Sequence, residues 1–241
     1  MPLDYMPYRD FDMSNLKQNG QLRWAPSYLR NRGQMTRGQK QAMRDWWPDY
    51  GILFQHDEAI DLDSCFGNDN PLIIEIGFGM GDHLVGLAAA IPNHRVLGIE
   101  VHRPGLAAAI QKIHEQALTN VRILRGDARL ILTDHLTIET ARAVIIQFPD
   151  PWPKPCDAHR RLVQTGLVEI IRQRLAPGGE LLIVTDVEDY ARHTEVILST
   201  ATGWEPVPRS SFHEHRSITP YEKKALEEGR QIHELSYRLI S

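Results

Sequence analysis

Short apolar runs rich in β-branched residues recur along the chain, and they alternate with stretches whose apolar positions are three and four residues apart. The short runs predict strands buried on both faces of a sheet, at residues 72–76, 95–101, 121–124, 143–148 and 181–184. The spaced stretches predict helices at residues 82–91, from about 104, at 130–132, 163–174 and 187–201. Alternation at residues 232–240 predicts one further, half-buried strand. This order is typical of a mostly parallel, doubly wound α/β sheet.

The N-terminal part of the chain has a different pattern. Glycines and prolines interrupt it and periodicity is weak, so we expect an arm over residues 1–55, with a short helix near 39–46, and a body over 56–241. The formal net charge is −4, yet residues 13–44 hold seven Lys or Arg and no Asp or Glu. Basic side chains interleaved with Trp24, Tyr28, Trp46 and Trp47 fit a surface that holds phosphates and stacks on bases. The arm could instead be pinned to its own domain, or be a solvated tail.

Composition excludes several other classes of protein. The 241 residues contain no apolar run approaching the roughly 20 residues of a membrane span. The first residues lack the basic and apolar regions of a signal peptide, so we expect a cytoplasmic protein. Cys65 and Cys156 are the only cysteines, and the eleven histidines show no HxxxH or HExxH spacing. We therefore expect neither a disulfide framework nor a metal site.

Three alternating glycines, Gly77, Gly79 and Gly81, lie between the first predicted strand and its helix. Such a corner lets the backbone approach a nucleotide that a Cβ atom would obstruct. The GxGxG spacing is one residue tighter than the dinucleotide pattern, and the carboxylate of Glu75 would repel a pyrophosphate. A ligand with an ammonium and a sulfonium would be attracted, which favours S-adenosylmethionine over NAD. A tight turn without a ligand shows the same spacing.

Five acidic residues fall at or just beyond the carboxyl ends of different predicted strands: Glu75, Glu100, Asp127, Asp150 and Asp186. A single acid there is usually a turn former or a helix cap, but five on one edge predict a ligand-binding rim. Glu100 is suited to accept hydrogen bonds from ribose hydroxyls, and Asp127 from an exocyclic amine such as adenine N6. Glu75 can neutralise the ammonium of a methionine-like arm.

The segment Phe-Pro-Asp-Pro-Trp-Pro-Lys at residues 148–154 has three prolines in five residues, which predicts a rigid loop. We expect Asp150 at the transfer site, Trp152 as a packing or stacking surface, and Lys154 near a phosphate or base. The alternative is a stiff crossover loop with an anchoring tryptophan.

Together these motifs resemble the bacterial tRNA (guanine-N7)-methyltransferase family, often called the TrmB type. The resemblance rests on the segments 75–81, 98–105, 125–128 and 148–154, and continues through 160–164, 185–190 and Thr-Pro-Tyr-Glu at 219–222. It implies a Rossmann-like class I fold with a seven-stranded, mostly parallel sheet and helices on both faces. It also implies S-adenosylmethionine as cofactor, with guanosine 46 in the variable loop of tRNA as the target.

The resemblance also implies roles for particular residues. Asp150 becomes the catalytic residue and shares the cofactor site with Glu75, Gly77, Gly79, Gly81, Glu100 and Asp127. The residues that the resemblance assigns to binding of the tRNA substrate are Lys154, Asp186, Thr219, Pro220, Tyr221 and Glu222. Further candidate RNA contacts are Arg32, Arg37, Lys40, Arg160 and Arg161.

Two departures from the family remove positive charge. Residues 155–159, Pro-Cys-Asp-Ala-His, stand where the family usually has a run rich in Arg, His and Lys, and Gln34 stands where an arginine is common. The alternatives are therefore a methyltransferase of this fold acting on another RNA or a small molecule, and a non-catalytic RNA-binding relative. We expect a monomer or a homodimer.

Overall fold

The computed structural model describes residues 17–18, 21–22, 34–54, 58–137 and 139–240. Within them, one sheet of seven strands has the order β5-β4-β3-β6-β7-β9-β8, and a separate pair joins β1 (Lys17–Gln18) to β2 (Gln21–Leu22). Strands β3 to β7 are parallel, whereas β9 is antiparallel to both of its neighbours. The seven strands are β3 (Leu72–Ile76), β4 (Arg95–Glu100), β5 (Val121–Arg125), β6 (Ala141–Gln147), β7 (Leu175–Thr185), β8 (Trp204–Pro206) and β9 (His233–Leu239).

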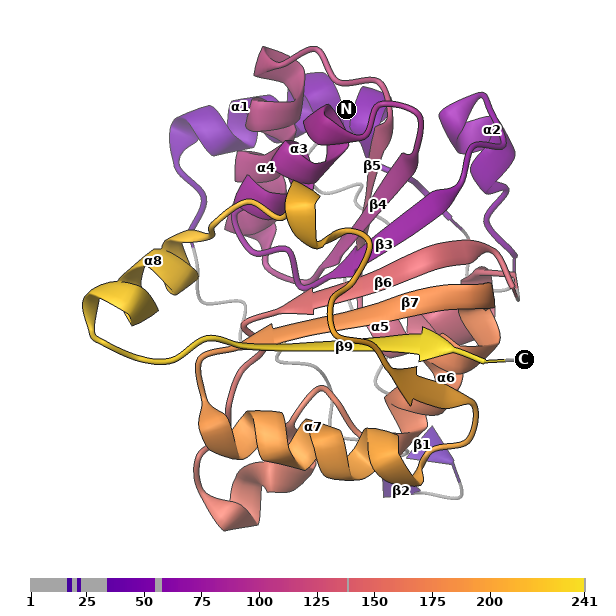
Figure 1. The fold of residues 1–241 in the computed structure, drawn as a ribbon. Coiled ribbons are helices and arrows are strands. Elements are labelled where there is room, and N and C mark those ends of the chain that lie inside the picture. The colour runs from indigo at the N-terminus through magenta and orange to yellow at the C-terminus, as the bar shows by residue number, and fades with distance from the viewer. Residues whose placement is uncertain (1–16, 19–20, 23–33, 55–57, 138, 241) are drawn as a thin grey trace.

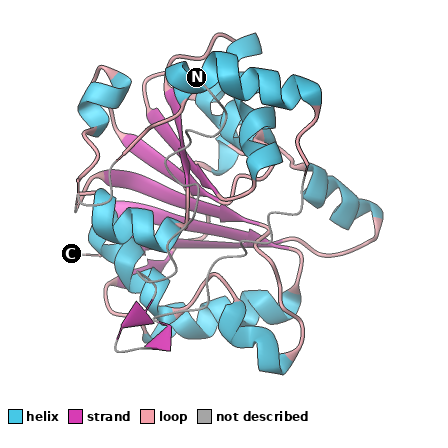
Figure 2. Cartoon of the chain, turned by 180° about the vertical axis from the view of Figure 1, so that it is seen from behind, coloured by secondary structure: helices cyan, strands magenta, loops and turns pink. Residues whose placement is uncertain are grey.

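Helices cover both faces of the sheet (Figures 1 and 2). One face packs against α1 (Arg37–Tyr50), α3 (Asp82–Ala90) and α4 (Arg103–Glu115). The other face is covered by α2 (Leu62–Phe66), the π-helix η2 (Ile131–His135), α6 (Thr165–Arg174) and α7 (Glu188–Thr200). The remaining helices are α5 (Ala128–Leu130), the 3-10 helices η3 (Pro155–Arg160) and η4 (His213–His215), and α8 (Pro220–Glu227). This is the predicted doubly wound α/β fold.

The central strands agree with the prediction because their apolar runs are buried on both faces. All five residues of β3 and all six of β4 are buried, as a two-faced parallel strand requires. The structure differs most at β7, which begins at Leu175 rather than at residue 181. The Pro-Gly-Gly that was predicted to separate helix from strand lies inside this strand, where its pairing with β6 is irregular.

No helix or strand was predicted for residues 58–70 and 202–231, where the structure has α2, β8 and α8. Both missed helices carry a start signal, because the side chains of Asp61 and Thr219 each accept a hydrogen bond from the backbone N–H three residues later. Pro220 at the first position of α8 is a further signal. Residues 202–231 therefore contain regular elements that the sequence pattern did not predict.

Helix α1 is longer than the short helix expected in the arm. Its start is fixed by a capping box, in which Thr36 and Gln39 exchange side-chain to backbone hydrogen bonds. Met43 and Trp47 are buried against the core below α4, and Trp46 stacks on His114 of α4 with ring centroids 4.1 Å apart. The described second half of the predicted arm thus packs on the body. The boundary at residue 55 stays a prediction.

If residues 34–54 belong to the folded body, Trp47→Ala is expected to lower the free energy of unfolding by about 3–5 kcal/mol, as for other buried aromatic truncations. The matched control is Leu53→Ala, because Leu53 is 55% exposed and its loss should change stability by at most about 0.5 kcal/mol. Urea unfolding measures both changes in stability, and it is followed by far-ultraviolet circular dichroism because that backbone signal does not rely on tryptophan fluorescence. Equal, small effects of the two substitutions would contradict this packing.

Candidate active site

The glycine turn after β3 has the backbone geometry that its sequence predicts. Gly77, Gly79 and Gly81 have φ angles of 72°, 56° and 80°, in the left-handed region that glycine adopts without strain. The turn also packs closely on α4, since a Cβ atom on Gly105 would lie 2.2 Å from the carbonyl oxygen of Gly79. The turn therefore has a fixed shape with its backbone accessible at the carboxyl end of β3.

Glu100 ends β4 beside this turn. Its Oε2 accepts a hydrogen bond from Gly79 N at 2.9 Å, and its Oε1 accepts from Val101 N at 2.7 Å and His102 N at 2.9 Å. Burial raises the pKa of the Glu100 carboxyl, and the three N–H donors oppose that shift by stabilising the anion. Oε1 already accepts two hydrogen bonds, but Oε2 accepts only one and can accept another, so a contact with a ribose hydroxyl stays compatible with this geometry.

Glu75 lies inside β3, and its side chain is only 2% exposed. Its Oε2 is 3.0 Å from Nδ1 of His83, a buried residue near the start of α3. His83 was not predicted from the sequence to belong to the site. No sequence signal identifies such a contact, because the two residues meet only after the glycine turn has folded α3 back over β3.

Asp127 follows β5 and caps α5, since its Oδ1 accepts a hydrogen bond from Arg129 N at 2.8 Å. The buried Arg129 in turn donates to the carbonyl oxygens of Arg161 at 3.3 Å and Leu162 at 3.0 Å. Asp127 thus has the capping role that is ordinary for an acid at this position. Its predicted contact with adenine N6 would use the remaining acceptor capacity of the carboxylate.

The loop that carries Asp150 is strained at two positions. Phe148 and Trp152 have φ angles of 47° and 44°, in the left-handed region that bulky residues rarely adopt. The Asp150 carboxylate is exposed, and no hydrogen bond or ion pair joins it to a described residue. Partial desolvation by the surrounding loop raises its pKa above the usual range for an aspartate. A strained loop that presents an unpaired carboxylate is a common feature of functional sites.

Arg160 and Arg161 are adjacent in sequence but have different surroundings. Arg161 is buried, donates from Nε to the carbonyl oxygen of Pro151 at 3.0 Å and forms an ion pair with Asp189. Arg160 is exposed, with its guanidinium 5.1 Å from the Trp152 ring centre and 3.2 Å from Asp157. Arg161 therefore holds the loop from inside the protein, and Arg160 is the one that faces solvent.

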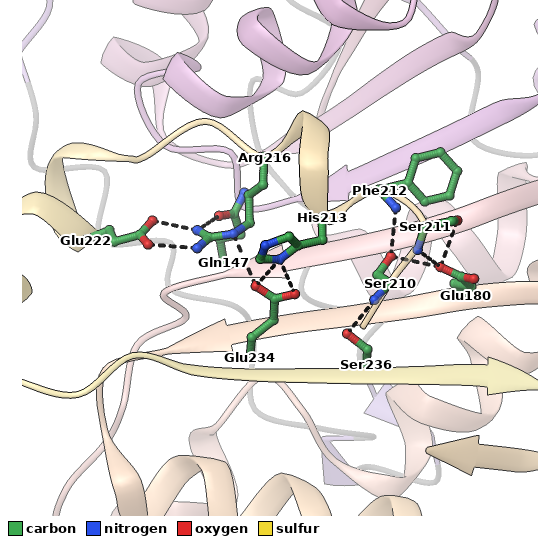
Figure 3. A network of polar contacts seen from close by, with 10 residues as sticks. All are labelled: Gln147, Glu180, Ser210, Ser211, Phe212, His213, Arg216, Glu222, Glu234 and Ser236. Atoms are coloured by element: carbon green, nitrogen blue, oxygen red, sulfur yellow. Dashed lines mark hydrogen bonds and ion pairs between the residues drawn. The ribbon is translucent and has the colours of Figure 1, made fainter. Parts of the chain in front are cut away.

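The segment 219–222 lies at the same edge of the sheet, where α8 extends away from the ends of β6 and β7 (Figure 1). Glu222 is 4% exposed and pairs with Arg216 through two contacts of 2.5 and 2.7 Å. Arg216 also reaches Gln147 Oε1 and Glu234 Oε2, each at 3.4 Å, and so joins α8 to β6 and β9 (Figure 3). Glu222 and the capping residue Thr219 are thus structural in this conformation.

The other residues predicted to bind the substrate are exposed to solvent or paired with another side chain of the protein. Tyr221 is 63% exposed, and its ring lies 3.9 Å from where a Cβ atom of Gly79 would be, so α8 borders the glycine turn. Pro220 and Lys154 are exposed, whereas Asp186 forms an ion pair with Arg230. Arg37 and Lys40 are exposed on α1, and Arg32 lies outside the described residues.

In the parts of the chain that the structure describes, no helix is both long enough and apolar enough to cross a membrane. Over the same residues, His, Cys, Asp and Glu side chains do not gather in groups of three or more that could hold a metal ion.

Solved structures with a similar fold include the antibiotic-resistance methyltransferase Kmr. It is 18% identical, with a TM-score of 0.50, over 79% of this chain and 95% of its own. A SAM-dependent O-methyltransferase from Thermotoga maritima is 16% identical, with a TM-score of 0.50, over 72% of this chain and 60% of its own. These similarities show the class I methyltransferase fold and no more.

Sequence comparison gives closer relatives. Residues 69–235 match a family described as "Putative methyltransferase". The tRNA (guanine-N(7)-)-methyltransferase of Nitrosomonas eutropha is 40% identical over 88% of this chain and 95% of its own length. The enzymes of that name from Hydrogenovibrio crunogenus and Escherichia coli K12 are 36% and 34% identical, over 89% and 92% of this chain and 90% and 95% of their own lengths. The chain therefore belongs to the tRNA (guanine-N(7)-)-methyltransferase family.

Proposed function

We propose that this chain transfers a methyl group from S-adenosylmethionine to N7 of guanosine 46 in the variable loop of tRNA. The proposal rests on the Asp150 carboxylate, which has no hydrogen bond or ion pair with a described residue and lies on a strained loop directly after β6. Strand β6 lies beside β3 and runs parallel to it. The Asp150 loop and the glycine turn therefore follow the ends of neighbouring strands. A cofactor bound at the turn and a base bound at Asp150 would therefore be neighbours. The related enzymes named for this reaction support the choice of acceptor.

The residues around the glycine turn fit S-adenosylmethionine. The turn leaves room for close approach of the ligand, Glu100 has unused acceptor capacity for the ribose, and Glu75 can attract the ammonium group. When bound, S-adenosylmethionine supplies an electrophilic methyl group on a sulfonium centre. Asp127 would contact the adenine amine in addition to capping α5. The turn residues, Glu75, Glu100, Asp127 and Asp150 together form the proposed cofactor site.

Asp150 is proposed to act on the guanine. Guanine N7 carries a free lone pair at neutral pH, so the protein need not remove a proton to create the nucleophile. The carboxylate can bind the N1 and N2 donors of the base, or stabilise the positive charge that methylation places on the purine. It is exposed and has no polar partner among the residues that the structure describes, which leaves it available for either contact. Since N7 can be engaged in tRNA tertiary contacts, the base would be turned outward to reach it, at a cost of a few kcal/mol.

The exposed basic side chains of Lys154, Arg160, Arg37 and Lys40 are proposed to bind the tRNA backbone. Arg161, Asp186, Thr219 and Glu222 would then support this surface from within, while Tyr221 is exposed beside the glycine turn. Cytoplasmic location and a monomeric or homodimeric state stay predictions from the sequence.

Asp150→Ala is expected to lower the rate of tRNA methylation by at least 10²-fold while leaving S-adenosylmethionine binding measurable, because one essential charge contact is lost. Asp150→Asn is the matched control for folding. The raised pKa means that the ionised carboxylate disfavours the folded state at neutral pH, so the neutral amide should not lower the melting temperature. Single-turnover methylation, calorimetric titration and thermal melting measure the three quantities. Retained turnover in both variants would remove Asp150 from the mechanism.

Asp157→Asn is expected to tighten tRNA binding several-fold at low salt without changing the maximal rate. It removes a negative charge from the proposed RNA surface and releases Arg160 from its ion pair. The control is Glu169→Gln, which makes the same charge change at an acid that pairs with Arg172 on α6. Filter binding at several salt concentrations measures the effect. Equal changes for the two variants would mean that η3 does not contact tRNA.

A further inference from the structure

The side chains of Glu75 and His83 form an almost fully buried polar pair, with exposures of 2% and 1%. Glu75 comes from β3, one residue before its last residue Ile76, and His83 is the second residue of α3. The glycine turn connects these two elements. The pair therefore lies directly beneath the backbone that is proposed to hold the cofactor, on the face of the sheet covered by α3.

The surroundings of the pair are otherwise apolar and tightly packed. Glu75 is aligned across the sheet with Gly98 on β4 and Ile145 on β6, neither of which offers a polar side chain. One turn along α3 from His83, a Cβ atom on Gly86 would lie 2.2 Å from Oγ of Ser217. The segment that leads into α8 thus covers α3 closely, and His83 has little freedom to move.

The pair retains unused hydrogen-bonding capacity. Nδ1 of His83 and Oε2 of Glu75 are 3.0 Å apart but not aligned as a hydrogen bond, and neither they nor Nε2 of His83 has a hydrogen-bond partner among the described residues. Buried polar atoms normally have such partners. Three such atoms at one place show that the described residues do not fully satisfy this pair.

We propose that His83 is a positioning residue that orients the carboxylate of Glu75 toward the amino-acid arm of S-adenosylmethionine. This inference rests on the proposed role of Glu75 in binding the ammonium. The imidazole lies 3.0 Å from one carboxylate oxygen on the α3 side, which directs the other oxygen toward the edge where the strands end. His83 itself does not touch the ligand, so its effect on affinity depends entirely on Glu75.

The test compares two ligands that differ only by the amino-acid arm, S-adenosylhomocysteine and 5′-methylthioadenosine. His83→Leu removes the polar contact with Glu75 and is expected to weaken S-adenosylhomocysteine binding about tenfold, a size typical of a polar contact with a charged group. Binding of 5′-methylthioadenosine, which has no ammonium, should be unchanged. His83→Asn retains an N–H donor near the Nδ1 position and should restore most of the affinity. Calorimetric titration of the unsubstituted protein and the two variants with each ligand measures the six dissociation constants.

Glu75→Gln and the double variant separate this inference from the function on which it rests. If His83 acts through Glu75, the His83→Leu effect on S-adenosylhomocysteine disappears in the Glu75→Gln background. If His83→Leu weakens the binding of both ligands equally, the inference is overturned, because a general structural defect would affect binding with or without the amino-acid arm. An effect of Glu75→Gln with none of His83→Leu would overturn it while leaving the role of Glu75 intact. No effect of Glu75→Gln on the selectivity between the ligands would overturn the role of Glu75 itself.

Discussion

The parallel pairing of β3 with β4 on one side and β6 on the other is the constraint on which the site depends. Ile76 at the end of β3 is in register with Ile99 and Ile146, so the three strands end at nearly the same level. The glycine turn, Glu100 and the Asp150 loop follow these three ends. Residues about 75 positions apart in the sequence are thereby brought to one edge, as ligand sites in open α/β sheets require.

Two arginines, one buried and one partly buried, fix the loops at this edge. Arg161 binds the backbone of the Asp150 loop from below, and Arg216 ties α8 to the ends of β6 and β9 through Glu222 and Glu234. A guanidinium can satisfy several carbonyl and carboxylate acceptors at once, which suits it to this task. The charged residues beside the site thus divide into inward ones that hold its shape and outward ones available to RNA.

The sequence predicted the central strands closely because continuous burial on two faces requires continuous apolar runs, as in β3. It also predicted the glycine turn, whose φ angles only glycine adopts freely. Sequence patterns did not indicate that Arg161 is buried and Arg160 exposed, or that Glu222 pairs with an arginine. Both features depend on contacts between elements that are distant in the sequence. The contact of His83 with Glu75 was missed for the same reason. Helix α8 had a local signal in Thr219 and Pro220 that was not used to predict a helix.

The most direct measurement is incubation of the purified chain with methyl-labelled S-adenosylmethionine and unmodified tRNA, followed by digestion and nucleoside analysis. The account predicts label in 7-methylguanosine alone, located at position 46, and none when guanosine 46 is replaced by adenosine. Label in another nucleoside, or label that persists in the substituted tRNA, would contradict it.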